Sequence, residues 1–127
     1  MNQDAPTVLV IEDEPSAREL LTQYFDSVGV LTVCAGSAEE GVLRAQELRP
    51  DAIMLDLVLP GRTGWRVLDD LRADPATRTI PVIVTSVLDF DQAAMMRGAK
   101  GYLQKPLKKE AVLRALRQHL PARFSGI

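Results

Sequence analysis

Five short apolar stretches recur along the chain, and a longer stretch of helical period follows each of them. The apolar stretches run from Thr7 to Ile11, Leu31 to Cys34, Ala52 to Leu55, Ile80 to Thr85 and Gly101 to Gln104. They do not alternate strictly between apolar and polar positions, which is typical of strands covered by helices on both faces. The regular alternation of strand and helix predicts parallel strands joined by right-handed crossovers. The expected fold is therefore α/β, with helices on both faces of one sheet.

The helical stretches carry start and stop signals of their own. The first has Pro15 near its first turn and stops at Gly29, and the second opens with a possible capping box formed by Ser37 and Glu40. The positions of the second helix expected to face the sheet are Ala38, Val42, Ala45 and Leu48. Three further helices are expected from about Gly64 to Asp74, Asp89 to Arg97 and Lys108 to Leu120. The fourth of the five helices is short.

Length and composition restrict the classes of protein to which the chain can belong. Its 127 residues fit a single domain, 1–127, with a core of about 7–120. A net charge of −2 without a dense Lys/Arg cluster argues against direct nucleic-acid binding. The single cysteine, the absence of a signal-peptide pattern and the lack of any membrane-length apolar run predict a cytoplasmic protein that does not enter membranes.

Three acidic residues stand where predicted strands end. Glu12 and Asp13 close the first apolar stretch, and Asp56 closes the third. If these strands are neighbours in a parallel sheet, the three carboxylates share one pocket. Two unit charges about 4 Å apart repel by roughly 4 kcal/mol at an effective dielectric constant near 20. A hard divalent cation, or a lysine such as Lys105 after the last strand, is therefore expected among them.

Two later motifs extend this constellation and carry a resemblance to a known family. Ser86 directly follows the fourth apolar stretch, and Lys105 with Pro106 directly follows the fifth. Taken together, the motifs resemble the receiver domain of two-component response regulators over roughly residues 7 to 120. The matching segments are the acidic-pair strand Val8 to Glu14, the phosphoacceptor loop Leu55 to Gly61 with Gly64, the Ser/Thr position Ser86, the switch aromatic Tyr102, and Lys105 with its typically cis proline.

The resemblance implies a fold and a reaction. The fold would be flavodoxin-like, a doubly wound five-stranded parallel sheet of strand order 2-1-3-4-5 with five helices and a shortened fourth helix. Asp56 would take a phosphoryl group from the phosphohistidine of a sensor histidine kinase or a histidine phosphotransfer protein, in a two-component system or phosphorelay. Mg²⁺ would be held by Asp13, Asp56 and the Val58 backbone carbonyl, with Glu12 acting through water.

The remaining motif residues would turn phosphorylation into a change in partner binding. Lys105 would hold the phosphate from the side opposite the metal as a point charge. Ser86 would donate its hydroxyl to a phosphoryl oxygen only once the phosphate is present, and Tyr102 would then rotate toward the vacated space. Such a switch requires two packings that differ by a few kcal/mol.

Several positions depart from the family pattern. Val87 stands where a small residue is usual, and its branched side chain is expected to crowd the route to Asp56 and slow phosphotransfer. Ser86 and Lys105 are 19 positions apart, which is shorter than the pattern by about one helical turn. Because the fourth helix belongs to the family's usual dimerisation surface, we expect a monomer or a weak dimer.

Two further groups of positions bear on rate and partner choice. Val58 and Leu88, each two residues beyond a site residue, are apolar, which predicts slow autodephosphorylation. The resemblance places kinase specificity on the exposed face of the first helix, around Ser16, Arg18, Glu19 and Gln23.

Other interpretations of the same residues are available. Taken singly, Asp56 could be a solvated turn residue, Lys105 a surface lysine and Ser86 a helix cap. A phosphatase of the aspartate-nucleophile type generally has a second acid two positions after the nucleophile, where this chain has Val58. A phosphorylation-independent adaptor and an isolated receiver fragment of a larger response regulator remain as alternatives. We expect no enzymatic activity beyond self-phosphorylation from a phosphodonor and slow autodephosphorylation.

Overall fold

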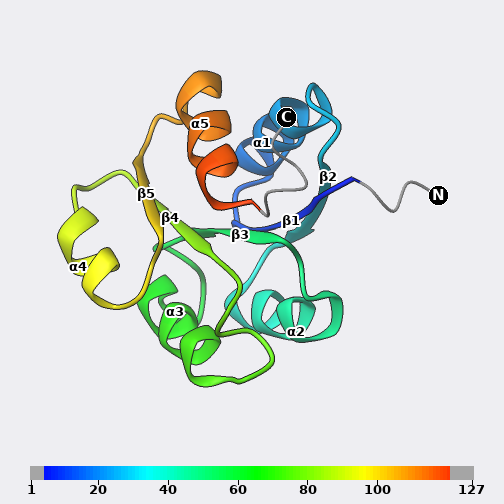
Figure 1. Ribbon diagram of the computed structural model, residues 1–127. Helices are drawn as coiled ribbons and strands as arrows, with labels where there is room; N and C mark the ends of the chain where they lie inside the picture. The colour runs from blue at the N-terminus through cyan, green and yellow to red at the C-terminus, as the bar shows by residue number, and fades with distance from the viewer. Residues whose placement is uncertain (1–4, 121–127) are drawn as a thin grey trace.

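The computed structural model describes residues 5–120, in which strands and helices alternate from β1 to α5 (Figure 1). The strands are β1 (Thr7–Ile11), β2 (Leu31–Ala35), β3 (Ala52–Asp56), β4 (Val82–Ser86) and β5 (Gly101–Gln104). The helices are α1 (Pro15–Asp26), α2 (Ala38–Leu48), α3 (Gly64–Ala73), α4 (Asp91–Met96) and α5 (Lys109–His119). All ten predicted elements are present, and their bounds differ from the predictions by a few residues at most. None of the helices in this range is long and apolar enough to cross a membrane.

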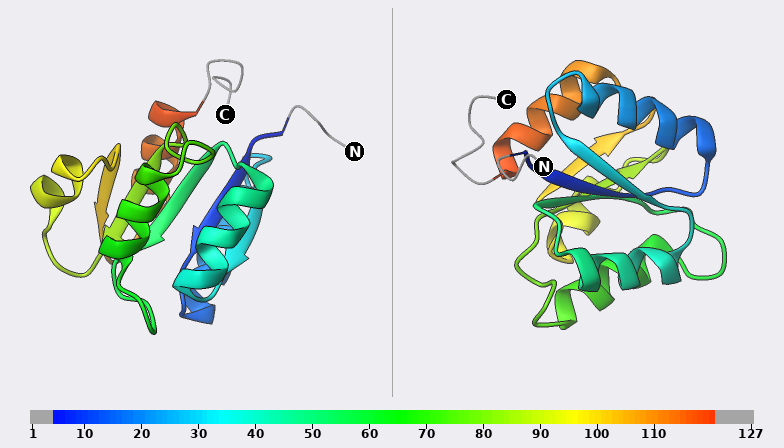
Figure 2. Two further views of the ribbon diagram at one scale, coloured as in Figure 1. Left: turned by 90° about the horizontal axis from the view of Figure 1, so that it is seen from below. Right: turned by 90° about the vertical axis from the view of Figure 1, so that its right-hand side faces the viewer.

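The five strands form one parallel sheet in the order β2-β1-β3-β4-β5, which is the order that the resemblance implies. Helices α1 and α5 cover one face, and α2, α3 and α4 cover the other (Figures 1 and 2). The strand order reverses between β1 and β3, which is where ligands bind in open sheets of this kind. The carboxyl ends of these two strands are therefore the natural place for a site.

Two apolar clusters, one on each face, hold the sheet. Leu9 and Ile11 belong to the cluster under α2 and α3, whereas Val8 and Val10 belong to the cluster under α1 and α5. All four side chains are fully buried, because β1 lies inside the sheet with helices on both faces. The strand that leads to the acidic residues is thus fixed on both sides.

The two ends of α1 are set by a proline at its start and a glycine after its end. Pro15 occupies the first turn, where a missing N–H costs no helical hydrogen bond. The chain leaves the helix through a turn in which Gly29 has φ 76°, a conformation that glycine adopts without strain. The Val30 N–H then donates to the Phe25 carbonyl (3.0 Å) and directs the chain into β2.

The second helix corrects two predictions. The Ser37 hydroxyl accepts a hydrogen bond from the Glu40 N–H (3.2 Å), but the Glu40 carboxylate accepts from the Gly36 N–H (2.7 Å) rather than from Ser37. Only half of the predicted capping box forms. Leu48, predicted to face the sheet, is 45% exposed because it lies in the last turn, where Arg49 is already left-handed (φ 46°).

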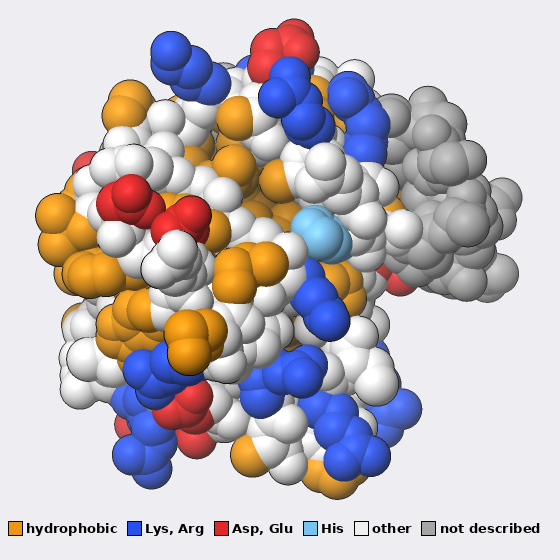
Figure 3. All heavy atoms as spheres, turned by 60° about the vertical axis from the view of Figure 1, so that its left-hand side comes forward, with side chains coloured by type: hydrophobic (Ala, Val, Ile, Leu, Met, Phe, Trp, Pro, Cys, Tyr) orange, Lys and Arg blue, Asp and Glu red, His pale blue; other side chains and the backbone are white. Residues whose placement is uncertain are grey.

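The fourth helix is six residues long, in agreement with the predicted shortening. Its connections to α3 are aromatic and ionic: the rings of Trp65 and Phe90 meet edge to face at 5.8 Å, and the Arg97 guanidinium lies 4.8 Å from the Trp65 ring centre. Arg97 also pairs with Asp69 of α3. In the face formed by α4, β5 and α5, hydrophobic side chains gather on the α4 side, with Lys and Arg above and below them (Figure 3). The exposed apolar residues here are Val87, Leu88, Phe90, Met95 and Met96.

Candidate functional site

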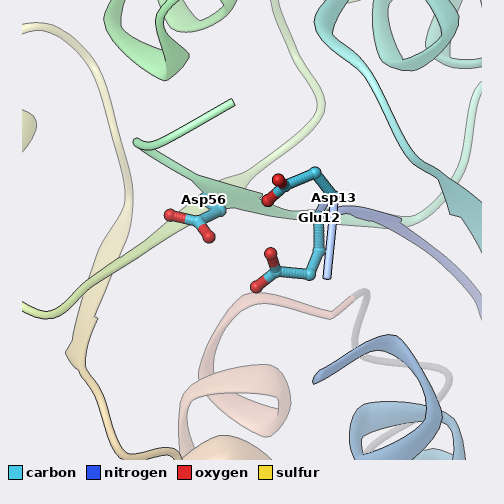
Figure 4. A group of neighbouring side chains, drawn as sticks. All are labelled: Glu12, Asp13 and Asp56. Carbon is cyan, nitrogen blue, oxygen red and sulfur yellow. The ribbon is translucent and has the colours of Figure 1, made fainter. Parts of the chain in front are cut away.

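The sheet register brings the three acidic residues together. Ile11 pairs with Leu55, so Glu12 and Asp13, which follow β1, stand beside Asp56 at the end of β3. One carboxylate oxygen from each of the three lies within 4.8 Å of the others. Figure 4 shows the three side chains extending from the two strand ends into the same space. The predicted shared pocket is therefore present.

The three carboxylates differ in their access to solvent. Glu12 is 3% exposed and Asp56 is 5% exposed, whereas Asp13 lies on the surface. Buried charges are rare unless they are paired or coordinate a metal, since the loss of hydration is costly. The arrangement thus combines two buried carboxylates that need a cation with a third that faces the solvent.

Lys105 supplies one positive charge to this pocket. Its Nζ donates to Glu12 Oε1 (2.7 Å) and to Asp56 Oδ2 (2.8 Å). The pairing of β5 with β4 places it there, because the Lys105 N–H donates to the Ser86 carbonyl (2.7 Å) directly beyond the last ladder pair. The Lys105–Pro106 peptide bond is cis, as the resemblance implied.

Burial and pairing shift the pKa values of both partners. Burial raises the pKa of Glu12 to about 7; the hydrogen bond from Lys105 opposes this rise, and the Asp56 carboxylate adds to it. Burial alone would lower the pKa of the Lys105 ammonium, but its hydrogen bonds to Asp56 and Glu12 outweigh burial and raise that pKa. Lys105 is therefore a fixed cation near neutral pH, whereas Glu12 changes its charge there.

Backbone groups complete the surroundings of Asp56. The Val58 N–H donates to Asp56 Oδ1 (2.9 Å), so each carboxylate oxygen of Asp56 has one donor. Gly64 packs against the end of β3 so closely that an added Cβ would lie 2.3 Å from the Asp56 carbonyl oxygen. Only a glycine lets α3 begin this close to the strand. The Val58 carbonyl, predicted to bind metal, belongs to the same loop, and its role stays a prediction.

Ser86 ends β4 and Tyr102 pairs with Val84 from the neighbouring strand β5, and both side chains bind the loop after β4. Ser86 is 2% exposed, and its hydroxyl accepts a hydrogen bond from the Leu88 N–H (3.1 Å). The Tyr102 hydroxyl donates to the Leu88 carbonyl and accepts from the Phe90 N–H (3.0 Å). Both predicted switch side chains therefore hold this loop by its backbone.

Two side chains lie differently from the sequence-based expectation. Val87 is 61% exposed, so most of its surface faces solvent, and its predicted effect on phosphotransfer stays a prediction. Arg18, predicted to face a partner, is half-buried and bonds back to the carbonyls of Glu12 and Asp13. The signal that could have identified it is an arginine one turn into the helix that directly follows the acidic pair.

The donor set fits a hard divalent cation. Carboxylate oxygens are the ligands that Mg²⁺ prefers, and three of them converge here. Lys105 balances only part of their charge, since it is one cation between two carboxylates, and Asp13 has no ion pair among residues 5–120. Asp13 and Asp56, with Glu12 beside them, are the residues that would hold such an ion.

Comparison with known proteins decides the family. The family model of the response regulator receiver domain matches residues 8–117. The chain belongs to this family. Among relatives of this receiver, the nitrate/nitrite response regulator protein NarL of Escherichia coli is 38% identical over 120 residues, which are 92% of this chain and 56% of NarL. The receiver thus spans about half the length of that relative.

Solved receiver structures agree with the fold. The Vibrio cholerae chemotaxis protein CheY4 matches with a TM-score of 0.85 and 25% identity, covering 91% of this receiver and 99% of CheY4. The receiver domain of the Pseudomonas aeruginosa sensor histidine kinase PA1611 matches with a TM-score of 0.83 and 26% identity, covering 91% and 97% of the two chains. That structure is described with a magnesium ion coordinated in its active-site cleft.

Proposed function

We propose that this receiver is a phosphoacceptor that takes a phosphoryl group on Asp56 from the phosphohistidine of a sensor histidine kinase or a histidine phosphotransfer protein. The observation that carries the proposal is the state of the Asp56 carboxylate. It is buried, one oxygen is held by Lys105 and the other by the Val58 N–H, and the acidic cluster surrounds it. A nucleophile held in one orientation by fixed donors avoids much of the entropic cost of reaction.

The transfer conserves atoms and electrons without a further reactant. A carboxylate oxygen of Asp56 attacks phosphorus and forms an O–P bond, while the P–N bond to the donor imidazole breaks and its electron pair stays on the imidazole nitrogen. The Lys105 ammonium lies 2.8 Å from Asp56 Oδ2, so it stands next to the phosphoryl oxygens as they arrive. A preorganised cation at that place stabilises the charge of the transition state.

Magnesium is the proposed cofactor. When bound, Mg²⁺ would neutralise the oxygens of the transferring phosphoryl group. Asp13 and Asp56 are the proposed direct ligands, with Glu12 acting through water and the Val58 carbonyl as a further oxygen donor. The convergence of three carboxylates supports this assignment, as does the magnesium described in the PA1611 receiver.

The proposed switch follows from the hydrogen bonds of Ser86. Its hydroxyl oxygen accepts from the Leu88 N–H, which leaves its proton free to be donated to a phosphoryl oxygen on Asp56. Closing on the phosphate would draw the loop after β4 toward Asp56 and change the partners of Tyr102. We propose that the surface of this loop and α4 is thereby altered and that partner binding follows.

Further properties belong to the same proposal. The receiver acts on its own aspartate and on no separate substrate, it works in the cytoplasm as a monomer or weak dimer, and it contacts partner proteins rather than nucleic acid. With Val58 and Leu88 beside the site, we expect the aspartyl phosphate to hydrolyse slowly. A phosphoryl half-life of only seconds, measured by loss of the phosphorylated mass, would contradict this expectation.

The test is phosphorylation with a small phosphodonor. The protein is incubated with acetyl phosphate and Mg²⁺, and intact mass is compared with Asp56→Asn and with Asp89→Asn, a matched change of an exposed aspartate outside the cluster. We expect one phosphoryl mass gain in the wild type and in Asp89→Asn, dependence on Mg²⁺, and no gain in Asp56→Asn. No gain in the wild type, together with no Mg²⁺ affinity, would favour the phosphorylation-independent adaptor.

A further inference from the structure

Arg18 binds the backbone of the two residues that follow β1. A single guanidinium nitrogen, Nη1, donates to the carbonyl oxygen of Glu12 (2.8 Å) and to that of Asp13 (3.0 Å). An arginine near anions usually pairs with a carboxylate in bidentate fashion. None of the ion pairs in residues 5–120 includes Arg18. Its guanidinium is therefore used to hold main chain.

The position of Arg18 is itself fixed from several sides. The Arg18 N–H donates to the Glu14 carbonyl (3.1 Å) in the first turn of α1, and the Thr22 hydroxyl donates to the Arg18 carbonyl (2.8 Å). The guanidinium also lies against Gly36 in the loop after β2, where an added Cβ would be 3.2 Å from Nη1. The side chain is thus confined between two loops at the carboxyl end of the sheet.

Asp13 depends on this contact more than its neighbours do. The carboxylate of Glu12 is held by Lys105 and by the Glu14 N–H (3.2 Å), and that of Asp56 is also held by two donors. The Asp13 carboxylate is exposed, and within residues 5–120 it has neither a hydrogen bond nor an ion pair. Its direction is therefore set by its backbone, whose carbonyl is held by Arg18.

We propose that Arg18 is a positioning residue for the divalent cation. It holds the Glu12–Asp13 segment so that the Asp13 carboxylate faces Asp56 before the ion arrives. Groups that orient metal ligands commonly contribute about 10-fold to 100-fold in metal affinity. This inference rests on the proposed function, because it concerns the same magnesium site.

The direction in which Mg²⁺ affinity changes when Arg18 is replaced distinguishes a positioning role from an effect of its positive charge. Removing a positive charge near a cation site strengthens cation binding if Coulomb interactions alone decide the affinity. Removing a residue that orients a metal ligand weakens cation binding. Arg18→Met deletes the charge and the two hydrogen bonds together, so a weaker Mg²⁺ affinity in a folded variant cannot come from the lost charge and indicates lost positioning.

The experiment measures Mg²⁺ affinity by titration calorimetry of the full chain, with Mn²⁺ relaxation measurements as a second readout. The variants are Arg18→Met, Arg18→Lys and, as a matched loss of one charge, Arg117→Met, whose exposed side chain has no ion pair or hydrogen bond in residues 5–120. We expect the dissociation constant to rise about tenfold in Arg18→Met. Arg18→Lys should recover part of the loss, and Arg117→Met should match the wild type.

Gly36→Ala gives a second test that leaves every charge in place. Its Cβ would press on Nη1 of Arg18, so we expect Mg²⁺ binding to weaken, but less than in Arg18→Met. Thermal unfolding without metal shows whether Arg18→Met folds. If that variant does not fold, Gly36→Ala tests the positioning role in its place. Unchanged or tighter Mg²⁺ binding in the folded Arg18 variants would overturn the positioning role. A wild type that binds no Mg²⁺ would instead refute the proposed function, so the two failures are distinguishable.

Discussion

The acidic end of β1 and β3 and the short helix α4 are held in place by interactions of different strength. At the acidic end, buried Glu12 and Asp56 share the Lys105 ammonium, and breaking a buried pair by removing one partner typically costs about 3 to 5 kcal/mol. At α4, Arg97 lies on the surface against Trp65 and Asp69, where such contacts contribute about 1 kcal/mol or less each.

This difference suits the proposed switch. A ligand can move a two-state equilibrium only by its differential affinity, so the element that moves must be held by no more than a few kcal/mol. The surface contacts that join α4 to α3 are of this size, so α4 and the loop before it fit the proposed switch, whereas the acidic end offers a firmly held place for the proposed chemistry. Substitutions in the two regions should therefore differ in size and in how far their effects spread.

Gly64→Ala should cause the largest loss, because it acts on the rigid region. The new Cβ would lie 2.3 Å from the Asp56 carbonyl and 2.5 Å from the Leu57 Cα, and backbone cannot yield as a side chain does. We expect the free energy of unfolding to fall by about 3 kcal/mol in urea denaturation. Gly36→Ala, where the nearest atom is the end of an arginine side chain, is the control and should lose far less.

The charge of Glu12 makes the rigid region sensitive to pH. Because the pKa of Glu12 rises to about 7 in the folded protein, the folded state keeps a proton that the unfolded state has released. The stabilisation from this group is complete below about pH 4.5 and is lost as the pH rises through about 7. We expect the metal-free wild type to lose about 1 to 3 kcal/mol relative to Glu12→Gln between pH 5 and pH 8.

The control for this pH effect is Glu19→Gln, which changes an exposed acid on α1. Its stability should follow that of the wild type at every pH, in urea denaturation with a metal chelator present. Parallel stability curves for Glu12→Gln and the wild type would show that Glu12 is charged throughout this range.

The sequence was most informative where one physical constraint dominates. Apolar strands buried on both faces predict the sheet. The acidic residues at the ends of β1 and β3 predict the pocket, because the carboxyl ends of neighbouring parallel strands lie at the same end of the sheet. It was least informative where a side chain can choose among partners. Glu40 binds the Gly36 N–H instead of completing the capping box, and Arg18 turns back to two carbonyls, because both outcomes depend on loop geometry that spacing does not encode.

Trp65→Ala should loosen α4 and leave the acidic end unchanged. The substitution removes the edge-to-face contact with Phe90 and the ring under Arg97. We expect the free energy of unfolding to fall by about 1 to 2 kcal/mol, as measured by denaturation followed by circular dichroism. Amide hydrogen exchange should speed up in α4 relative to the wild type and stay unchanged in β3. Trp65→Phe keeps an aromatic ring and should lose less. Exchange accelerated equally in β3 would mean that the two regions are not independent.

Tyr102→Phe should have the smallest effect and the most local one. It removes only the hydroxyl that donates to the Leu88 carbonyl and accepts from the Phe90 N–H, so the loss in stability should be about 1 kcal/mol. The Phe90 amide should then exchange faster in hydrogen-exchange NMR, by about fivefold. Tyr24→Phe is the matched control, because it removes a hydroxyl that donates to the Leu107 carbonyl (3.0 Å) away from this loop. If both variants speed Phe90 exchange equally, the hydroxyl of Tyr102 has no specific role in holding the loop.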